Sequence, residues 1–554
     1  MSFARISSMR GAGRLAGMLA LVPVLMFGLM LALLLALLSS PPAQAATPRD
    51  QLVIGMNMNN LLSIDPAGAT GNDVLGVVAN LYDYLVELDP RDLASVKPAL
   101  AESWAFGDDR RSLTLTLRQG VRFQSGRPLT AEDAAWSLHR VLKLNLAMAS
   151  PWKSYGFSAA NAPRMIRALD ARTLRIDFPE PTDPKMVLYT LATSVSAAIL
   201  DRDAVLAHER NGDLGAAWLL THAAGSGPFS LTEWRAKDAM LLDRFNGYWR
   251  GPARLRRVVM RHVPESLSLR FMITRGDVDL AAGMAGPDIE ALKHDASVVV
   301  QPVLRGTSYY VALSMKNRRF ADRRVRLALR SLIDYDGINK AIMPNYGVAH
   351  QRPVMIGLAA ALPDPGYRLD VARARRLLAE AGYPQGFRTT IRVLSDPPLI
   401  NIATSLQATL ALAGIEAEIL SGTGNQVYGA MRDRKFDIVV GRGGGGVEPH
   451  PHANLRALVY NPDNSDAARL TNFQGWRTGF HSPAINRLIE EAVREPDEAR
   501  QNAMYREVQQ LYDSEVGAIQ PIAQMQETVV LSKRVHGYVG HPSATTHLRD
   551  VYKD

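Results

Sequence analysis

One stretch of the chain carries an unusually complete structural pattern. Residues 99–140 read ALAESWAFGDDRRSLTLTLRQGVRFQSGRPLTAEDAAWSLHR. The LTLTL run at 113–117 alternates apolar and polar side chains, which predicts a strand with one buried face. A turn is expected at SGRP (125–128), and TAED (130–133) has the capping-box pattern that begins a helix. This stretch therefore predicts a strand, a turn and a capped helix.

A second pattern, between residues 370 and 440, alternates helices and strands. Asp370 is placed to cap a helix that ends near Gly382. Three strands follow, with two helices between them: the strands at 389–394, 415–419 and 436–440, and the helices at 402–412 and 427–432. Because right-handed crossovers join parallel strands in such a series, we expect a doubly wound α/β lobe.

Length and composition indicate a globular protein with more than one core. The chain has 554 residues, 47% hydrophobic and 21% charged, which excludes disordered and collagen-like classes. It has no cysteine, which excludes a disulfide framework, a zinc–thiolate site and a cysteine nucleophile. The net charge of +9 is spread over scattered arginine pairs with acidic residues between them, so no nucleic-acid partner is expected.

The first 45 residues have the order of a secretory signal. Arg5, Arg10 and Arg14 precede an uncharged run at 15–38, and small residues and prolines follow up to Ala45. We expect cleavage after Ala45 and export to the periplasm of a Gram-negative cell, without a lipid anchor because there is no cysteine to modify. The apolar run is also long enough to span a bilayer, so an uncleaved, membrane-tethered form stays open.

Catalytic and cofactor motifs are incomplete. The Gly-x-Gly-x-x-Gly pattern at 441–446 matches the dinucleotide fingerprint, but prolines at 449 and 451 prevent a helix from starting at its third glycine. Gly-x-Ser-x-Gly and Walker patterns are missing from the sequence. We therefore expect neither an enzyme nor a bound cofactor. No metal site is assigned either, although His450 and His452, two residues apart in a Pro-rich loop, could present imidazoles to a metal.

Residues 99–140 resemble a signature of the family 5 extracellular solute-binding proteins of ABC importers, which include oligopeptide-, dipeptide- and nickel-binding proteins. The resemblance covers residues 52–545. It continues in GSGPFSLTEW (225–234), RGDVDLA (275–281), FADRRVRLALRSLIDYDGINKAI (320–342), LLAEAGYPQGF (377–387), SPAINRLIEEA (482–492) and MYREVQQLYDSEVGAIQPI (504–522).

The resemblance implies an α/β fold with two lobes: the periplasmic binding protein fold of type II, in its large peptide-binding subclass, with a two-strand hinge and an extra N-terminal subdomain. Lobe I is expected at 46–303, including an inserted subdomain at about 90–220, lobe II at 304–522, and a tail at 523–554 that returns to lobe I. A monomer would close on a small organic solute, peptide-like or anionic, and deliver it to an inner-membrane ABC permease with a cytoplasmic ATPase.

Two other functions stay open. A nickel or metal-chelate binding protein of the same family would use His450 or His452. A secreted hydrolase or a membrane-tethered sensor would belong to a different class.

One loop departs from the peptide-binding members. There, the strand matching 436–440 leads into Gly-Trp-x-x-Asp, whose Asp pairs with the α-ammonium of the peptide. One alignment puts Arg442 at the Trp and Gly445 at the Asp, and another puts Gly444 and Val447 there. In both alignments, the chain has no carboxylate at the Asp position. Glu448 could replace it, or Arg442 could receive an anion through its planar guanidinium; the alternative is that both side chains face solvent.

Other ligand-binding candidates come from segments that the resemblance places at the cleft. They are Asn59 and Asn60 after the first strand, and Tyr309 and Tyr310 at the first crossing between lobes. Because successive strand residues face opposite sides, one of the two tyrosines could instead be core. Trp476 could flank the site or pack on a loop.

Overall fold

The computed structural model describes residues 47–445 and 448–554. Residues 47–554 form one compact unit. The predicted signal at 1–45 lies outside the described residues. In the described part of the chain, no helix is both long enough and apolar enough to cross a membrane.

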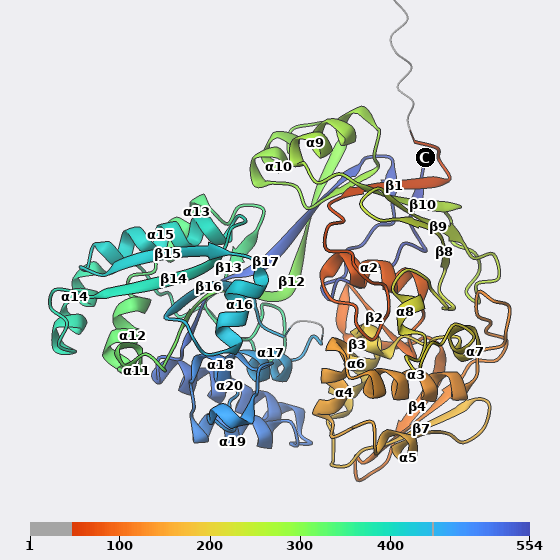
Figure 1. Ribbon diagram of the computed structural model, residues 1–554, viewed down its shortest axis with the longest axis horizontal. Helices are drawn as coiled ribbons and strands as arrows, with labels where there is room; N and C mark the ends of the chain where they lie inside the picture. Colours follow the sequence, from red (N-terminus) through yellow and green to blue (C-terminus); the bar gives the residue numbers. More distant parts are fainter. Residues whose placement is uncertain (1–46, 446–447) are drawn as a thin grey trace, which may run out of the picture. The chain divides into compact units, whose positions relative to one another are not determined.

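A mixed sheet of 11 strands runs through this unit (Figure 1). Its order is β15-β14-β16-β12-β17-β11-β1-β10-β9-β8, and β13 pairs with β17. The strands are β1 Gln51–Met56, β8 Phe229–Arg235, β9 Ala239–Arg244, β10 Arg257–His262, β11 Leu280–Ala282, β12 Val298–Leu313, β13 Gly347–Ala349, β14 Arg388–Leu394, β15 Glu416–Gly422, β16 Ile438–Gly443 and β17 Ile519–Ser532. Neighbours in the sheet thus come from distant parts of the sequence.

Three clusters of buried apolar side chains divide the unit. Two clusters draw on residues from 52 to 298 and from 529 to 551, and we call the part that they hold together lobe I. The third draws on residues 309–523, and we call that part lobe II. The two-lobed α/β fold is therefore confirmed. The division at 303/304 and 522/523, and the subdomain at 90–220, stay predictions.

The antiparallel strands β12 and β17 connect the lobes. At one end β17 pairs with β11 of lobe I, and at the other end β12 pairs with β16 of lobe II. Their ladder shifts register between Leu304 and Ser308, and again between Tyr309 and Tyr310. A shift of this kind interrupts regular pairing and bends the strand locally.

Lobe II has the predicted alternation of helices and strands. Strands β14, β15 and β16 are parallel, α15 and α16 connect them, and Figure 1 draws these helices on opposite faces of the sheet. Asp370 caps α14 by accepting a hydrogen bond from the backbone N–H of Arg373 at 2.8 Å. The sheet of this lobe is mixed, however, because β16 also pairs antiparallel with the connecting strand β12.

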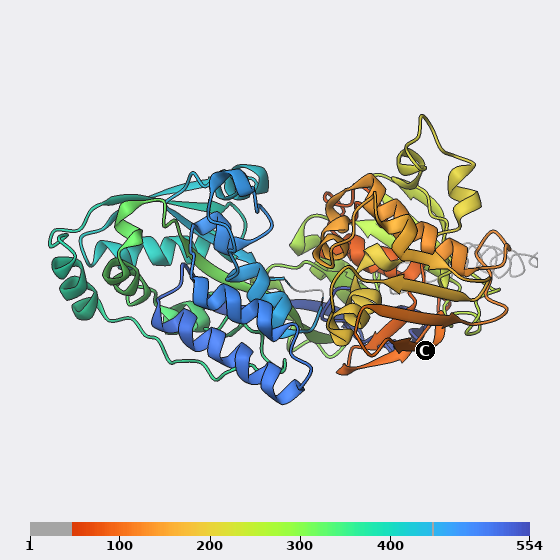
Figure 2. The same ribbon diagram turned by 90° about the horizontal axis from the view of Figure 1, so that it is seen from below.

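The helices of lobe II cover both faces of its sheet, and α19 and α20 lie side by side (Figure 2). They are α11 Arg318–Ala321, α12 Arg323–Arg330, α13 Tyr335–Ala341, α14 Val371–Glu380, α15 Leu399–Ala411, α16 Gly424–Arg432, α17 Pro451–Leu458, α18 Gln474–Thr478, α19 Pro483–Ala492 and α20 Glu498–Ser514, with a 3-10 turn, η3, at Asp466–Ala468.

The strand, turn and capped helix expected near residue 113 are confirmed in lobe I. Strand β5 (Ser112–Leu117) buries every second side chain within the antiparallel sheet β4-β5-β7-β6, whose other strands are β4 Ala101–Phe106, β6 Ile166–Ala168 and β7 Thr173–Asp177. Helix α3 (Ala131–Leu144) begins where Thr130 donates from its backbone N–H and its hydroxyl to the Asp133 carboxylate, both at 2.9 Å. On α3, Arg140 forms a fully buried ion pair with Asp65 at 2.7 Å.

The remaining elements of lobe I are short. Its helices are α2 Asn72–Leu81, α4 Ser150–Ser154, α5 Ala162–Met165, α6 Pro184–Thr193, α7 Arg202–Leu206, α8 Ala216–Leu219, α9 Ser266–Arg275 and α10 Gly286–Leu292, with 3-10 turns η1 Ala147–Ala149 and η2 Val195–Ala197. Two further strand pairs are β2 Val86–Asp89 with β3 Asp92–Pro98, and β18 Val535–His536 with β19 Tyr552–Lys553.

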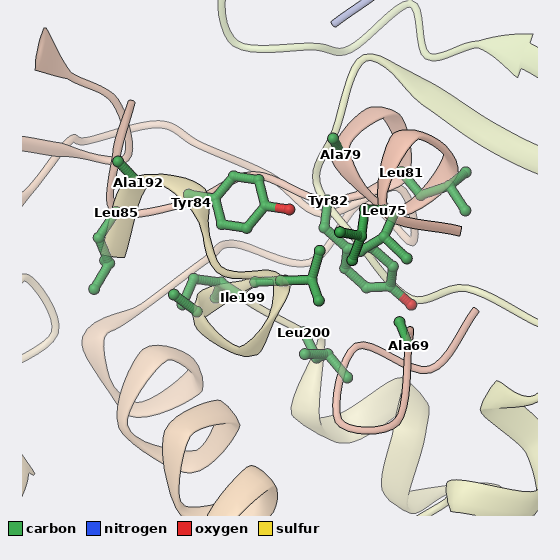
Figure 3. Packing of buried hydrophobic residues seen from close by; sticks show 14 of the residues in the cluster. Ala69, Leu75, Ala79, Leu81, Tyr82, Tyr84, Leu85, Ala192, Ile199 and Leu200 are labelled. Carbon is green, nitrogen blue, oxygen red and sulfur yellow. The ribbon is translucent and has the colours of Figure 1, made fainter. Parts of the chain in front are cut away.

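The core of lobe I packs around the end of α2. Figure 3 shows Tyr82 and Tyr84 among apolar side chains of α2 and of the segment containing Ile199. Gly227 lies against the end of α2. A Cβ at this position would be 2.6 Å from the Leu81 carbonyl carbon, so a larger residue would displace α2.

A buried carboxylate lies next to this glycine. Asp83 accepts hydrogen bonds from Ser226, Tyr248 and Trp249 at 2.9, 2.9 and 3.2 Å. Burial raises the pKa of Asp83 to about 6, although these bonds act in the opposite direction.

The two ends of the described unit meet in lobe I. The Lys553 ammonium is buried and donates to Thr47 Oγ1 at 2.6 Å and to Asp279 Oδ2 at 2.9 Å. The Asp279 carboxylate also accepts a bond from the Val53 N–H of β1 at 2.8 Å. The C-terminal residues therefore hold the first strand of the sheet.

Candidate binding site between the lobes

The two lobes touch along a seam between α6 and α20. Gln501 donates to Asp183 at 2.6 Å, and Lys185 pairs with Glu498 at 2.6 Å. A third contact joins Asn472 to Ser150 at 3.2 Å. These polar contacts bring side chains of both lobes around a shared space.

Two neighbouring cavities open along this seam. The smaller, of about 180 Å³, is lined by residues of both lobes: Ser150, Pro151, Ser154, Tyr155, Met186 and Thr190 from lobe I, and Gly445, Glu448, His452, Ala453, Arg456, Ala457, Asn472 and Phe473 from lobe II. The larger, of about 330 Å³, shares Ser154, Tyr155, Met186, His452 and Arg456 with it. The larger cavity is at the lower end of the range of about 300–1,000 Å³ that is typical of ligand sites, and the smaller one adjoins it.

Glu448 contributes an acidic group to the smaller cavity. Thr190 of lobe I donates to its Oε1 at 3.4 Å. Burial raises the pKa of the Glu448 carboxyl, and the positive charge of Arg456 acts in the opposite direction. The sequence-predicted residues Gly445 and Glu448 are therefore brought together at one cavity.

Arg456, on α17, was not singled out from the sequence. It lines both cavities, and its guanidinium lies 5.3 Å from the centre of the Phe473 ring. Burial lowers its pKa, and within the described residues it has no hydrogen-bond or ion-pair partner. Sequence reasoning missed it because Arg456 lies in the second turn of α17, beyond a loop whose register could not be assigned.

The glycine loop after β16 is shaped by Asn454. The Asn454 amide donates to the carbonyl oxygens of both Gly444 and Gly445 at 2.8 Å. Gly445 has φ of +66°, and a Cβ there would lie 2.5 Å from the Ala453 carbonyl oxygen. Val447, which the second alignment places at the Asp position, lies outside the described residues. The first helix after the loop is α17, which begins at Pro451 and not at the third glycine.

Arg442 and Tyr309 lie opposite each other on β16 and β12. The Arg442 side chain is exposed, whereas Tyr309 is buried. Burial raises the pKa of Tyr309 to about 12, and the nearby Arg442 guanidinium acts in the opposite direction. The Arg442 backbone N–H donates to the Tyr428 hydroxyl at 3.2 Å. Arg442 is thus held near the end of β16 and is not among the residues that line the cavity at Glu448.

A lobe I carboxylate lies near this arginine. Asp73, on α2, has its pKa raised to about 6, mainly by burial and next by the charge of Glu527. Arg305 and Arg442 oppose that increase. Arg305 itself donates to Glu527 at 2.7 Å where β12 and β17 pair. The hinge strands therefore carry charged groups that the sequence pattern did not reveal.

Two other predicted residues, Tyr310 and Trp476, have packing partners. Tyr310 is fully buried, accepts a bond from Gln474 at 3.0 Å, and packs against Gly441, where a Cβ would lie 3.0 Å from its ring. Trp476 is buried, donates to the Ser465 carbonyl at 2.9 Å, and carries the Arg434 guanidinium on its ring at 4.6 Å. The structure thus gives Trp476 the loop-packing position that the sequence left open.

Asn59 and Asn60 occupy an exposed turn after β1. The backbone of Asn59 donates to the side chain of Asn57 at 2.9 Å, so the turn is locally hydrogen-bonded. The structure does not bring them to the cavity that Gly445 and Glu448 line.

His450 and His452 are both buried beside the aromatic ring of Tyr505. The Nδ1 atom of His450 accepts the His452 N–H at 3.2 Å and so caps α17. Burial lowers the pKa of His450 to about 4 and that of His452 well below its ordinary range. Among residues 47–445 and 448–554, no group of three histidine, aspartate or glutamate side chains could hold a metal ion.

Known proteins resemble this chain over nearly all of its length. The probable D,D-dipeptide-binding periplasmic protein of Escherichia coli K12 is 27% identical over 524 residues, covering 91% of this chain and 94% of the relative. Heme-binding protein A of Haemophilus influenzae is 26% identical over 486 residues, covering 83% and 85%. The structure of a Helicobacter pylori periplasmic binding protein with the peptide STSA shares the fold, with a TM-score of 0.75, 24% identity, and coverage of 91% and 98%.

The family follows from a direct match. The sequence pattern of the bacterial extracellular solute-binding proteins, family 5, in its middle part, matches residues 95–466. That range includes the capped helix, the connecting strand β12 and the glycine loop, whereas the second connecting strand, β17, lies beyond it. The chain belongs to the bacterial extracellular solute-binding proteins of family 5.

Proposed function

We propose that this protein is the periplasmic solute-binding component of an ABC importer. It captures a small organic solute between its lobes and presents the closed form to an inner-membrane permease with a cytoplasmic ATPase. Binding favours closure because a solute that touches both lobes makes those contacts only when the cleft is shut. The solute leaves chemically unchanged, so no catalytic group is required.

The observation that carries this proposal is the cavity at Glu448. Its walls come from Tyr155 and Thr190 on one lobe and from Glu448 and Arg456 on the other. A solute in that space would join the lobes directly. Family membership and the dipeptide-binding relative favour a peptide-like solute.

The charges at the cavity favour a solute with polar groups of both signs. The Glu448 carboxylate would accept bonds from an ammonium group, replacing the carboxylate lost at Gly445. Arg456 would receive anionic groups through its planar guanidinium, and Arg442, which does not line the cavity, would do so only for a solute that extends beyond it. A metal-chelate solute has less support, because His450 is already the cap of α17.

A ligand screen with matched variants tests the proposal. Chain lacking residues 1–45 is heated with di- to pentapeptides, amino-acid conjugates, sugar acids or metal complexes, and hits are measured by calorimetry. A solute at 100 times its Kd stabilises the folded state by about 2.7 kcal/mol, which is a clear shift in Tm. Glu448→Gln should weaken binding, whereas Glu416→Gln, an exposed change on β15, should not.

The screen can also contradict the site. Peptides that bind wild-type protein, Glu448→Gln and Arg456→Gln with equal Kd would place the solute elsewhere. Turnover of any compound by the protein would contradict a binding-only function.

We also propose that residues 1–45 are a signal removed on export. The mature protein would then diffuse in the periplasm, since no cysteine is available for lipidation. N-terminal sequencing of protein recovered from the periplasm should begin at Ala46. A sequence beginning at Met1 in a membrane fraction would support the tethered form instead.

A further inference from the structure

A second charged hollow lies in lobe II, away from the seam between the lobes. It has a volume of about 440 Å³ and is lined by Lys316, Asn317, Thr390, Arg392, Arg434, Lys435, Phe436 and Asp437. Four of these side chains are basic and one is acidic. The hollow lies where β14 and β16 begin, whereas the glycine loop of the candidate solute site follows the end of β16. We refer to it as the basic hollow.

The acidic residue does not neutralise the basic ones. Asp437 accepts bonds from the Asn317 amide at 2.7 Å, from the Thr389 hydroxyl at 3.2 Å and from the Thr390 N–H at 3.3 Å. Its oxygens are therefore occupied by neutral donors. None of the four basic side chains is therefore neutralised by Asp437.

Two of the basic residues share one exposed carboxylate. Arg434 and Lys316 both pair with Asp466, at 2.8 and 3.1 Å. Arg434 is buried, and its Nε atom has no hydrogen-bond partner among the described residues. Burial lowers the pKa of this arginine, which reflects the cost of holding its charge there.

The other two basic residues are unpaired. Within residues 47–445 and 448–554, neither the Arg392 guanidinium nor the Lys435 ammonium has a hydrogen-bond or ion-pair partner, and the Nε atom of Arg392 is completely buried. A guanidinium on a central strand with a buried, unsatisfied donor is unfavourable unless something accepts its hydrogen bonds. Arginine matches the paired oxygens of a carboxylate or phosphate group.

We propose that the basic hollow is a binding site for an anion with paired oxygens, a phosphate or carboxylate group, separate from the solute site. Arg392 and Lys435 hold the anion directly. Arg434 and Lys316 add positive charge behind it, and Asn317 and Thr390 keep the Asp437 carboxylate from closing the hollow.

Inorganic phosphate and succinate, each against chloride at equal ionic strength, test the site and separate the two chemistries. Wild-type protein should gain thermal stability with at least one of them, and calorimetry gives its Kd. Arg392→Gln and Lys435→Gln should each weaken that binding about tenfold or more, the loss expected for one charge-assisted contact. Arg388→Gln, on the same strand but exposed and paired with Glu416, should leave the Kd unchanged.

Three results would overturn the proposal. One is stabilisation by neither anion beyond chloride. Another is an unchanged Kd in Lys435→Gln, which is exposed and should fold even if Arg392→Gln does not. The third is parallel loss of binding in Arg388→Gln, which would show a general charge effect. Since Glu448→Gln leaves the basic hollow intact, it should not alter the Kd for the anion, whatever its effect on solute binding.

Discussion

Replacing Gly445 by alanine tests whether the glycine loop is held in the conformation that the structure shows. Its φ of +66° is in the left-handed region, where a residue with a Cβ loses about 1–2 kcal/mol. The added Cβ would also lie 2.5 Å from the Ala453 oxygen and 2.7 Å from the Ala457 Cβ, so the loop must move.

That movement has a definite energetic consequence. It would strain the two hydrogen bonds from the Asn454 amide to Gly444 and Gly445, each contributing about 0.5–1.5 kcal/mol. Together with the backbone term, we expect Gly445→Ala to lower the free energy of unfolding by about 2–5 kcal/mol. The lining of the cavity at Glu448 would change with it.

Urea unfolding of ligand-free protein, followed by circular dichroism, measures this loss. The matched control is Gly424→Ala at the start of α16, where an added Cβ meets nothing within 4 Å and φ is not positive. That change should be neutral or stabilising by up to about 1 kcal/mol. An Asn454→Ala change and the double variant give the coupling between loop and amide. Equal stability of Gly445→Ala and Gly424→Ala would refute the reasoning.

Three further predictions concern buried charges. The pKa of Asp83 is raised to about 6 from its ordinary 3.8, so its contribution to stability is full below pH 3.8 and is lost as pH rises through 6, by up to about 3 kcal/mol. Urea midpoints measured from pH 4 to 7 should show this slope. The same slope in Asp83→Asn would contradict the assignment. Asp65→Asn leaves the buried Arg140 charge unpaired and should lower the unfolding free energy by about 3–5 kcal/mol. The double variant Asp65→Leu with Arg140→Met should recover most of that loss. A double variant no more stable than the single one would argue against an unpaired charge as the cause. Glu448→Gln should raise the Kd of an ammonium-bearing solute about tenfold. In wild-type protein that Kd should rise as pH falls through the raised pKa of Glu448, because the carboxyl becomes protonated. The same Kd at pH 5 and pH 8 by calorimetry would rule out an ionised Glu448 as the contact.

Much of the fold could be predicted because local patterns and tertiary structure agree. The hydroxyl and carboxylate of the capping box at 130–133 satisfy the first turn of α3, and the same logic placed α14 behind Asp370. The mixed character of the lobe II sheet could not be predicted in this way. It depends on β12 and β17, which are more than 200 residues apart and have no local signal for their pairing.

The candidate site was only partly predictable for a related reason. Glu448 and Gly445 were found because they lie beside a recognisable strand, but Tyr155, Thr190 and Arg456 reach the cavity only through the contact between lobes. Trp476 illustrates the opposite case. An aromatic residue beside a glycine has the same sequence signature whether it lines a pocket or, as here, supports the Arg434 guanidinium.

The position of β17 in the sheet has a consequence for how the chain acquires its structure. This strand lies between β12 and β11, yet it begins more than 200 residues after both of them in the sequence. A chain that is synthesised from its N-terminus cannot complete the lobe I sheet until β17 has been made. Such long-range pairing slows folding and keeps early segments extended. The order of strands therefore delays compaction of lobe I until β17 has paired with both of its neighbours.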